Sequence, residues 1–333
     1  NVQQIVATGG AFAACLAENG QVVTWGDGDF GGDSSSVQEQ LFDVSEVFAS
    51  EDAFAALKRN GTVVTWGSPK HGGDSSAVQH QLRNVQMIVS TAWSFAALAD
   101  GILVTWGDPR CGGDSRMVQE QLGGKVTHIF SSKFAFAALL ADKTLVTWGR
   151  ASCGGDSSDV QARLKDVHSV HGSNIAMAAI VGTKRTVISW GFASAGGDCS
   201  LVQSKLKAVQ RLFATLSAFA ALLADGSVVT WGDPEAGGDA SSVQEKLKEV
   251  IHIASSHGAF AALTAQGEVL TWGSPMMGGD SSIVQDQLRQ IQNLHGSNGA
   301  FVALRSDGVV LTWGDAMCGG DITPSVQETL RGL

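Results

Sequence analysis

The sequence predicts a mainly β protein, a closed eight-bladed β-propeller whose blades each hold three antiparallel strands plus a short helix. One stretch, residues 22–26 with the sequence VVTWG, returns seven more times with little change. Successive Trp-Gly pairs lie 40 to 42 residues apart, a period typical of arrays, solenoids and propellers. The eight pairs begin at Trp25, Trp66, Trp106, Trp148, Trp190, Trp231, Trp272 and Trp313.

The first unit shows the elements in order. Residues 2–8 alternate apolar and polar positions, as a half-buried strand does, and residues 11–16 form a second strand after a glycine turn. A tight turn at residues 18–20 then leads into the Trp strand. After a Gly-Gly pair, Asp33 is suited to cap the free N–H groups of the next segment. Val37 and Leu41 lie four residues apart, which predicts a short helix over residues 34–41.

The remaining units repeat this pattern, and the unit of Trp190 diverges most, because Met177 replaces the usual Phe. After Trp313 the chain reaches a helix predicted at residues 326–330, and the strand that should follow is the one that begins the chain. We therefore expect residues 1–333 to form a single domain of eight repeats of about 41 residues. The C-terminal helix would pack beside the N-terminal strand and close the ring, which removes exposed sheet edges. An open superhelix is the alternative.

Composition narrows the classes of partner. The net charge is −10 and the 22 basic residues are spread over all eight units, whereas proteins that bind nucleic acid cluster their Lys and Arg residues. No apolar run is long enough to span a bilayer; association with a membrane complex from its periphery stays open. The chain starts at Asn1 without a leader, so the compartment is undetermined: an organelle after removal of a targeting peptide, or otherwise the cytoplasm.

Each unit follows the order I-x-A-S-x-x-A-F-A-A-L-x-x-D-G-x-V-V-T-W-G-x-x-x-x-G-G. This order resembles the regulator-of-chromosome-condensation (RCC-type) repeat, and the resemblance implies a propeller fold. It does not imply one function, because relatives include a nucleotide-exchange factor on chromatin, ubiquitin-ligase modules, a plant ultraviolet-B receptor and a bacterial β-lactamase inhibitor. Gly-Gly-Asp replaces the usual Gly-Gln-Leu-Gly of the family, and the Val-Gln helix replaces its Pro-containing outer strand. The Gly-Gly-Asp-Ser-Ser and Val-Gln signals look like repeats of dinoflagellate algae.

The sequence predicts no catalytic, cofactor-binding or metal site, and we expect a protein that is not an enzyme. Residues 26–31 match the G-x-G-x-x-G pattern, but the other units lack the middle glycine, so a turn is the better interpretation. The repeated Asp of Gly-Gly-Asp is better explained as a cap than as a ring of metal ligands. The histidines lack metal-site spacing, no nucleophile elbow is present, and the repeated Trp residues suit packing between neighbouring units better than light absorption.

The turn after the first strand and the loop after the Trp strand are the most variable parts of the unit, and both should emerge on one face. Loops that vary over a constant scaffold are where repeat proteins place function. The predicted protein-binding residues on these loops are Trp93, Phe134, Ile175, Leu216, Phe30, Phe192, Met276, Met277 and Met317. The first four are expected to occupy equivalent positions of consecutive units and to form an apolar arc; the alternative is that they fold inward and plug the ring.

These observations predict a non-enzymatic scaffold that binds a partner protein through the variable loop face. One alternative is a stoichiometric peripheral structural subunit of a large complex, such as an algal organellar one. Another, by analogy with the family, is a guanine-nucleotide exchange factor, although no unit is long enough to contain an insertion for engaging such a partner.

Overall fold

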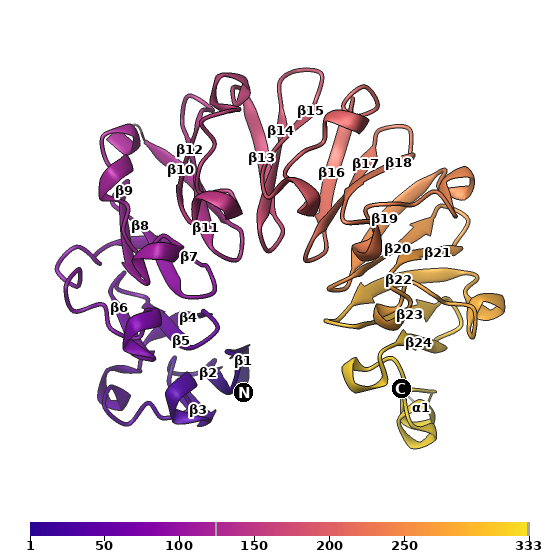
Figure 1. The fold of residues 1–333 in the computed structure, drawn as a ribbon. Helices are drawn as coiled ribbons and strands as arrows, with labels where there is room; N and C mark the ends of the chain where they lie inside the picture. Colours follow the sequence, from indigo (N-terminus) through magenta and orange to yellow (C-terminus); the bar gives the residue numbers. More distant parts are fainter. Residues whose placement is uncertain (124, 332–333) are drawn as a thin grey trace. The chain divides into compact units, whose positions relative to one another are not determined.

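The computed structural model describes residues 1–123 and 125–331. The chain divides into two compact units, Asn1–Val167 and His168–Leu333, and each is treated by itself. Eight three-stranded antiparallel sheets follow one another along the chain, each a simple meander of consecutive strands (Figure 1). The prediction of a mainly β protein built from eight blades is confirmed. The predicted closure, with the C-terminal helix beside the N-terminal strand, concerns how the two units meet and stays a prediction.

The strand bounds follow the predicted pattern closely. The first unit contains β1 (Val2–Ala7), β2 (Ala11–Leu16), β3 (Val22–Gly26), β4 (Val44–Ala49), β5 (Ala53–Lys58), β6 (Val63–Gly67), β7 (Val85–Ser90), β8 (Ser94–Ala99), β9 (Ile102–Gly107), β10 (Val126–Ser131), β11 (Ala135–Leu140) and β12 (Leu145–Gly149). From β13 onward the sheets belong to the second unit, with β13 (Val167–Gly172), β14 (Ala176–Val181), β15 (Thr186–Gly191), β16 (Val209–Ala214), β17 (Ala218–Leu223), β18 (Val228–Gly232), β19 (Val250–Ser255), β20 (Ala259–Thr264), β21 (Val269–Gly273), β22 (Ile291–Gly296), β23 (Ala300–Arg305) and β24 (Val310–Gly314).

The core lies between neighbouring blades. The middle strand of the second blade, β5, reads AFAALK, and its first five residues are buried although they point alternately to the two faces of the sheet. Small alanines let the next blade approach closely, while Phe54 stacks on Trp66 with ring centroids 5.1 Å apart. The apolar cluster that contains Ala53 and Ala55 also contains Phe95 and Trp106 of the third blade. Within a unit, the core of one blade is therefore completed by the next blade.

A tryptophan and a glycine form the joint between blades. The indole Nε1 of Trp106 donates to the carbonyl of Gly72 in the preceding blade over 3.0 Å. Gly72 has a φ of +103°, and a Cβ there would lie 2.5 Å from the Phe95 ring, so only glycine fits. The same bond recurs in the pairs Trp66–Gly31, Trp148–Gly112, Trp231–Gly196, Trp272–Gly237 and Trp313–Gly278.

The helix predicted after each Gly-Gly-Asp signal is shorter than expected. In the first repeat it is one 3₁₀ turn, Gln38–Gln40, within the predicted range 34–41. Leu41 leaves helical angles to bury its side chain, and the side chain of Gln38 bonds the carbonyl of Val22. So short a segment gains too few backbone hydrogen bonds to form an α-helix against these competing contacts. The helix predicted at residues 326–330 is a true α-helix, α1 (Pro324–Arg331).

Candidate interaction face

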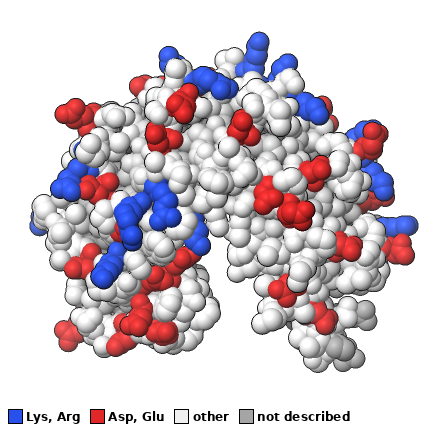
Figure 2. All heavy atoms as spheres, viewed as in Figure 1, with Lys and Arg blue, Asp and Glu red and all other residues white. Residues whose placement is uncertain are grey.

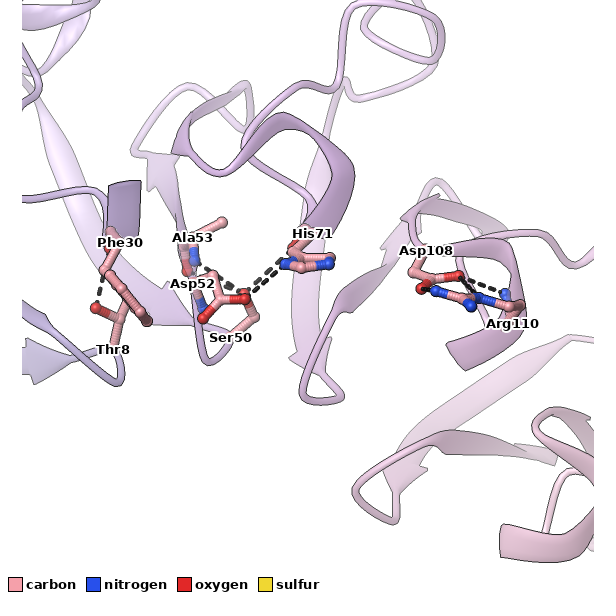
Figure 3. A network of polar contacts seen from close by, with 8 residues as sticks. All are labelled: Thr8, Phe30, Ser50, Asp52, Ala53, His71, Asp108 and Arg110. Atoms are coloured by element: carbon pink, nitrogen blue, oxygen red, sulfur yellow. Dashed lines mark hydrogen bonds and ion pairs between the residues drawn. The ribbon is translucent and has the colours of Figure 1, made fainter. Parts of the chain in front are cut away.

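Hydroxyl groups tie together the two variable loops in seven of the eight blades. The Oγ1 of Thr8 donates to the carbonyl of Phe30 over 2.9 Å, and the Oγ of Ser50 donates to the carbonyl of His71 over 3.3 Å (Figure 3). Equivalent bonds join Thr91 to Cys111, Ser132 to Cys153, Thr215 to Ala236, Ser256 to Met277 and Ser297 to Cys318. The turn after the first strand and the loop after the Trp strand thus share one side, as predicted. We call these two sets of loops the loop face.

Four planar groups on the loop face of the first unit contact one another in sequence. His71 stacks on Trp93 with centroids 5.2 Å apart and planes 21° apart, and Trp93 contacts Phe134 at 5.4 Å. The guanidinium of Arg150 lies 4.5 Å from the centroid of the Phe134 ring. All four side chains are partly exposed. We call His71, Trp93, Phe134 and Arg150 the aromatic row; its members come from loops of the second, third and fourth blades.

The row is anchored at the His71 end. The Nδ1 of His71 lies 2.5 Å from the Oδ2 of Asp52, which belongs to the turn between β4 and β5 (Figure 3). The side chains of this pair are 28% and 20% exposed, so solvent only partly screens the contact. The sequence predicts that Trp93 and Phe134 lie near each other, but it gives no indication of His71, Asp52 or Arg150. Their contacts join separate loops, and no spacing along the chain reveals them.

The predicted arc of four equivalent positions is wrong at Leu216. Ser173 and Thr215 begin the corresponding turns of the fifth and sixth blades. Their N–H groups donate to the carbonyls of Ala176 and Ala218, which closes each turn. Ile175 lies two positions after Ser173, whereas Leu216 lies one position after Thr215. Aligning the units by their apolar side chains shifts the register of this turn by one residue. The carbonyl of Leu216 accepts a hydrogen bond from the N–H of Asn174, and the N–H of Leu216 donates to the carbonyl of His257.

The other predicted binding residues differ in exposure. Phe30 is partly buried against the core of the first two blades and lies over Gly10, where a Cβ would come within 2.9 Å of its ring. The remaining four belong to the second unit, where Phe192 is 51%, Met276 82%, Met277 36% and Met317 95% exposed.

Charge divides the loop face by unit. The loops of the first unit hold Lys70, Arg110, Lys133 and Arg150, and Figure 2 shows basic side chains gathered on this unit. Arg110 pairs with Asp108 over 2.7 Å, and its hydrogen bonds lower the pKa of that carboxyl. Lys133 pairs with Glu51 over 2.7 Å. In the described part of the chain, Arg150 and Lys70 have no carboxylate partner. The corresponding loops of the second unit contain no Lys or Arg but hold Asp233, Glu235 and Asp315.

The repeated Asp residues act as caps. The carboxylate of Asp74 accepts the N–H of Ser76 over 2.9 Å, and the equivalent bond occurs at Asp33, Asp114, Asp156, Asp198, Asp239 and Asp280. As predicted, each Asp binds a free N–H of the next segment; it does so in a turn that precedes the 3₁₀ residues, whose own N-cap position, such as Val37, makes no side-chain bond. Within residues 1–123 and 125–331, no three His, Cys, Asp or Glu side chains gather in a way that could hold a metal ion. No helix in these ranges is long and apolar enough to cross a membrane.

No protein-family model and no curated protein sequence matches the chain. Its solved structural neighbours include the ectodomain of the receptor kinase ACR4 from Arabidopsis thaliana, with 16% identity and a TM-score of 0.44 over 79% of this chain and 90% of that one. Prp20p from Saccharomyces cerevisiae has 14% identity and a TM-score of 0.43 over 90% and 76%. The designed protein Ika8 has 13% identity and a TM-score of 0.40 over 94% and 96%. Each is only a distant structural neighbour.

Proposed function

We propose that this protein is a scaffold that binds another protein through its loop face, with the aromatic row of the first unit as the main anchor. The observation that carries the proposal is the row itself. Trp and Arg are enriched at binding hot spots, and aromatic residues are enriched at protein interfaces. Here such residues lie together on loops that differ from blade to blade. Phe192, Met276, Met277 and Met317 lie on the equivalent loops of the second unit, where exposed Met side chains would adapt to varied partners.

Loss of the row should release the partner. In Trp93→Ala and Phe134→Ala variants we expect the amount of captured partner to fall at least about tenfold, since hot-spot truncations typically cost 2 kcal/mol or more. The measurement is capture from an extract of the source organism, with quantification of each bound protein by mass spectrometry. Unchanged capture by a variant that carries both Trp93→Ala and Phe134→Ala would disprove the role of the row.

The opposite face supplies a matched control. Phe42 is 56% exposed and precedes Asp43, whose N–H bonds the hairpin turn at Asn19 on the side away from the loop face. A Phe42→Ala variant removes an aromatic ring of the same type and should leave capture unchanged. The mass of the native particle tests the alternative that the protein is a permanent subunit of a complex. A fixed stoichiometry would identify a permanent subunit, and a variable yield would identify a transient partner.

A further inference from the structure

We propose that the aromatic row recognises an acidic peptide segment, in which an Asp or Glu carboxylate next to a bulky apolar residue binds the guanidinium of Arg150. This inference rests on the proposed function and names the chemistry of the partner. The apolar neighbour would lie against the exposed parts of Trp93 and Phe134.

Arg150 is prepared for a carboxylate. Its guanidinium lies 4.5 Å from the Phe134 centroid, an arrangement that orients the planar group while leaving its N–H donors available. In residues 1–123 and 125–331 the structure gives it no acidic partner. A stacked guanidinium is weakly hydrated and already ordered, so a two-pronged bond to a carboxylate loses little conformational freedom.

Neighbouring cations are already engaged. Arg110 binds both carboxylate oxygens of Asp108, and Lys133 pairs with Glu51. Arg150 is thus the unpaired cation within the row. Lys70, which also lacks a carboxylate partner among the described residues, lines a groove between the second and third blades. Its charged or titratable neighbours in that groove are His71, Arg110, Asp74 and Asp108, and Asp108 is already paired with Arg110. An acidic segment that starts at Arg150 and follows the row reaches this groove at His71, where Lys70 offers a second positive charge.

The row is held in place before any partner arrives. Asp52 binds the Nδ1 of His71, the His71 ring stacks on Trp93, and Trp93 contacts Phe134. A preformed surface avoids the cost of ordering side chains on binding. The Asp52 bond therefore acts at a distance from the ligand as a positioning contact.

The same surroundings disfavour a polyanion such as single-stranded nucleic acid. Glu51, Asp52 and Asp108 lie on the same loops, and the chain carries a net charge of −10. Nucleic acids need many cations along the backbone and open aromatic faces for stacking bases. Here two of the rings already stack on each other, and the paired acids would repel successive phosphates. One or two carboxylates on a peptide match the two unpaired cations.

The test begins with the full chain, immobilised and exposed to a displayed library of random twelve-residue peptides. The most enriched peptide is then labelled with fluorescein, and its Kd is measured by fluorescence anisotropy on the parent protein and on variants. Arg150→Gln should weaken binding about tenfold or more, because hydrogen bonds to charged groups contribute about 1.5 to 3 kcal/mol. Replacement of the peptide's acidic residue by its amide should produce the same loss on the parent protein and no further loss on Arg150→Gln.

Arg83→Gln is the matched control, since Arg83 is exposed and holds the position in its blade that Phe42 holds on the opposite face. Circular dichroism melting of each variant separates loss of binding from loss of fold. Enriched peptides without acidic residues, no enrichment over a blank surface, or equal binding by Arg150→Gln would each overturn the inference. Tighter binding of a twenty-residue oligo-thymidine than of any peptide would also overturn it, in favour of nucleic acid.

Failure here can be told apart from failure of the proposed function. If Met276→Ala abolishes peptide binding and Arg150→Gln does not, the loop face still binds protein, and only the proposed preference for an acidic peptide is disproved. If binding is lost in Phe42→Ala or Arg83→Gln and kept in the row variants, the loop face itself is the wrong surface.

Discussion

At the scale of residues, a side-chain relay explains why Thr, Ser and Gln recur in the repeat. In the fourth blade the Oγ1 of Thr147 lies 2.9 Å from the Oγ of Ser157, which donates to the Oε1 of Gln161 over 2.7 Å. The Nε2 of Gln161 then donates to the carbonyl of Leu145 over 2.8 Å. The relay ties the turn after Gly-Gly-Asp to the Trp strand and satisfies polar atoms in a buried site.

The sixth blade lacks one member of this relay and so provides a test. Ala240 occupies the Ser position and is 2% exposed, while Thr230 and Gln244 are retained. Ala240→Ser should complete the relay and raise the free energy of unfolding by about 1 kcal/mol, the typical net contribution of an added hydrogen bond. Ser281→Ala in the seventh blade should lower it by about 1 to 2 kcal/mol, because Thr271 and Gln285 lose their shared partner. Urea denaturation measures both, and shifts of the same sign would contradict the relay.

At the scale of elements, the Asp caps make the turns sensitive to acid. Backbone hydrogen bonds from the Ser two residues on lower the pKa values of Asp33, Asp74, Asp156 and Asp280. A carboxyl with a lowered folded pKa contributes stability above its unfolded pKa, and this is lost as pH falls through the folded value. The loss should therefore begin near the ordinary Asp pKa of about 3.9 and continue below it.

Asparagine keeps the cap without titrating, because its amide oxygen accepts the same N–H bond. In the triple variant Asp74→Asn, Asp156→Asn, Asp280→Asn, we expect the fall in Tm between pH 5 and pH 3 to be smaller than in the parent. A control triple, Asp159→Asn, Asp286→Asn and Glu39→Gln, removes the same charge at exposed positions outside the caps. Equal acid sensitivity in the cap triple and the control triple would show that net charge, not capping, sets the response.

Much of each element could be predicted because its signals are local. Alternating apolar residues, turn glycines and the Asp cap specify strands, turns and a common loop face. The helix was overestimated at residues 34–41, since Gln38 bonds a carbonyl sixteen residues away rather than continuing a helical turn. The position of Leu216 in its turn was predicted wrongly for a similar reason. The register of a turn depends on its backbone hydrogen bonds, and an apolar side chain in the sequence does not indicate them. The His71–Trp93 contact joins two blades, and the Arg150–Phe134 contact joins two loops of one blade, so neither has a local signal in the sequence.

At the scale of the whole molecule, the first blade and the last blade each carry one half of the joint between blades. These two halves lack the burial that is seen at the other joints. In the first unit, Phe12 and Trp25 are 45% and 46% exposed, whereas the equivalent Phe54 and Trp66 are 0% and 3% exposed. In the second unit, Gly319 has a φ of +96°, and a Cβ there would meet nothing within 4 Å. At the equivalent Gly278, a Cβ would lie 2.5 Å from the Phe301 ring. We propose that these halves pair within one chain and close the eight blades.

Alanine at Gly319 tests this closure. Gly101→Ala measures strain alone, because Gly101 has a positive φ and open space, and should cost about 1 to 2 kcal/mol. Gly278→Ala adds a clash with Phe301 and should cost a further 1 to 3 kcal/mol or so. If the ring closes, Phe12 covers Gly319, and Gly319→Ala should match Gly278→Ala in urea denaturation; a cost equal to that of Gly101→Ala would show that this face is uncovered. Repeating the measurement at two protein concentrations distinguishes closure within one chain from pairing with a second copy, because only the second makes stability depend on concentration.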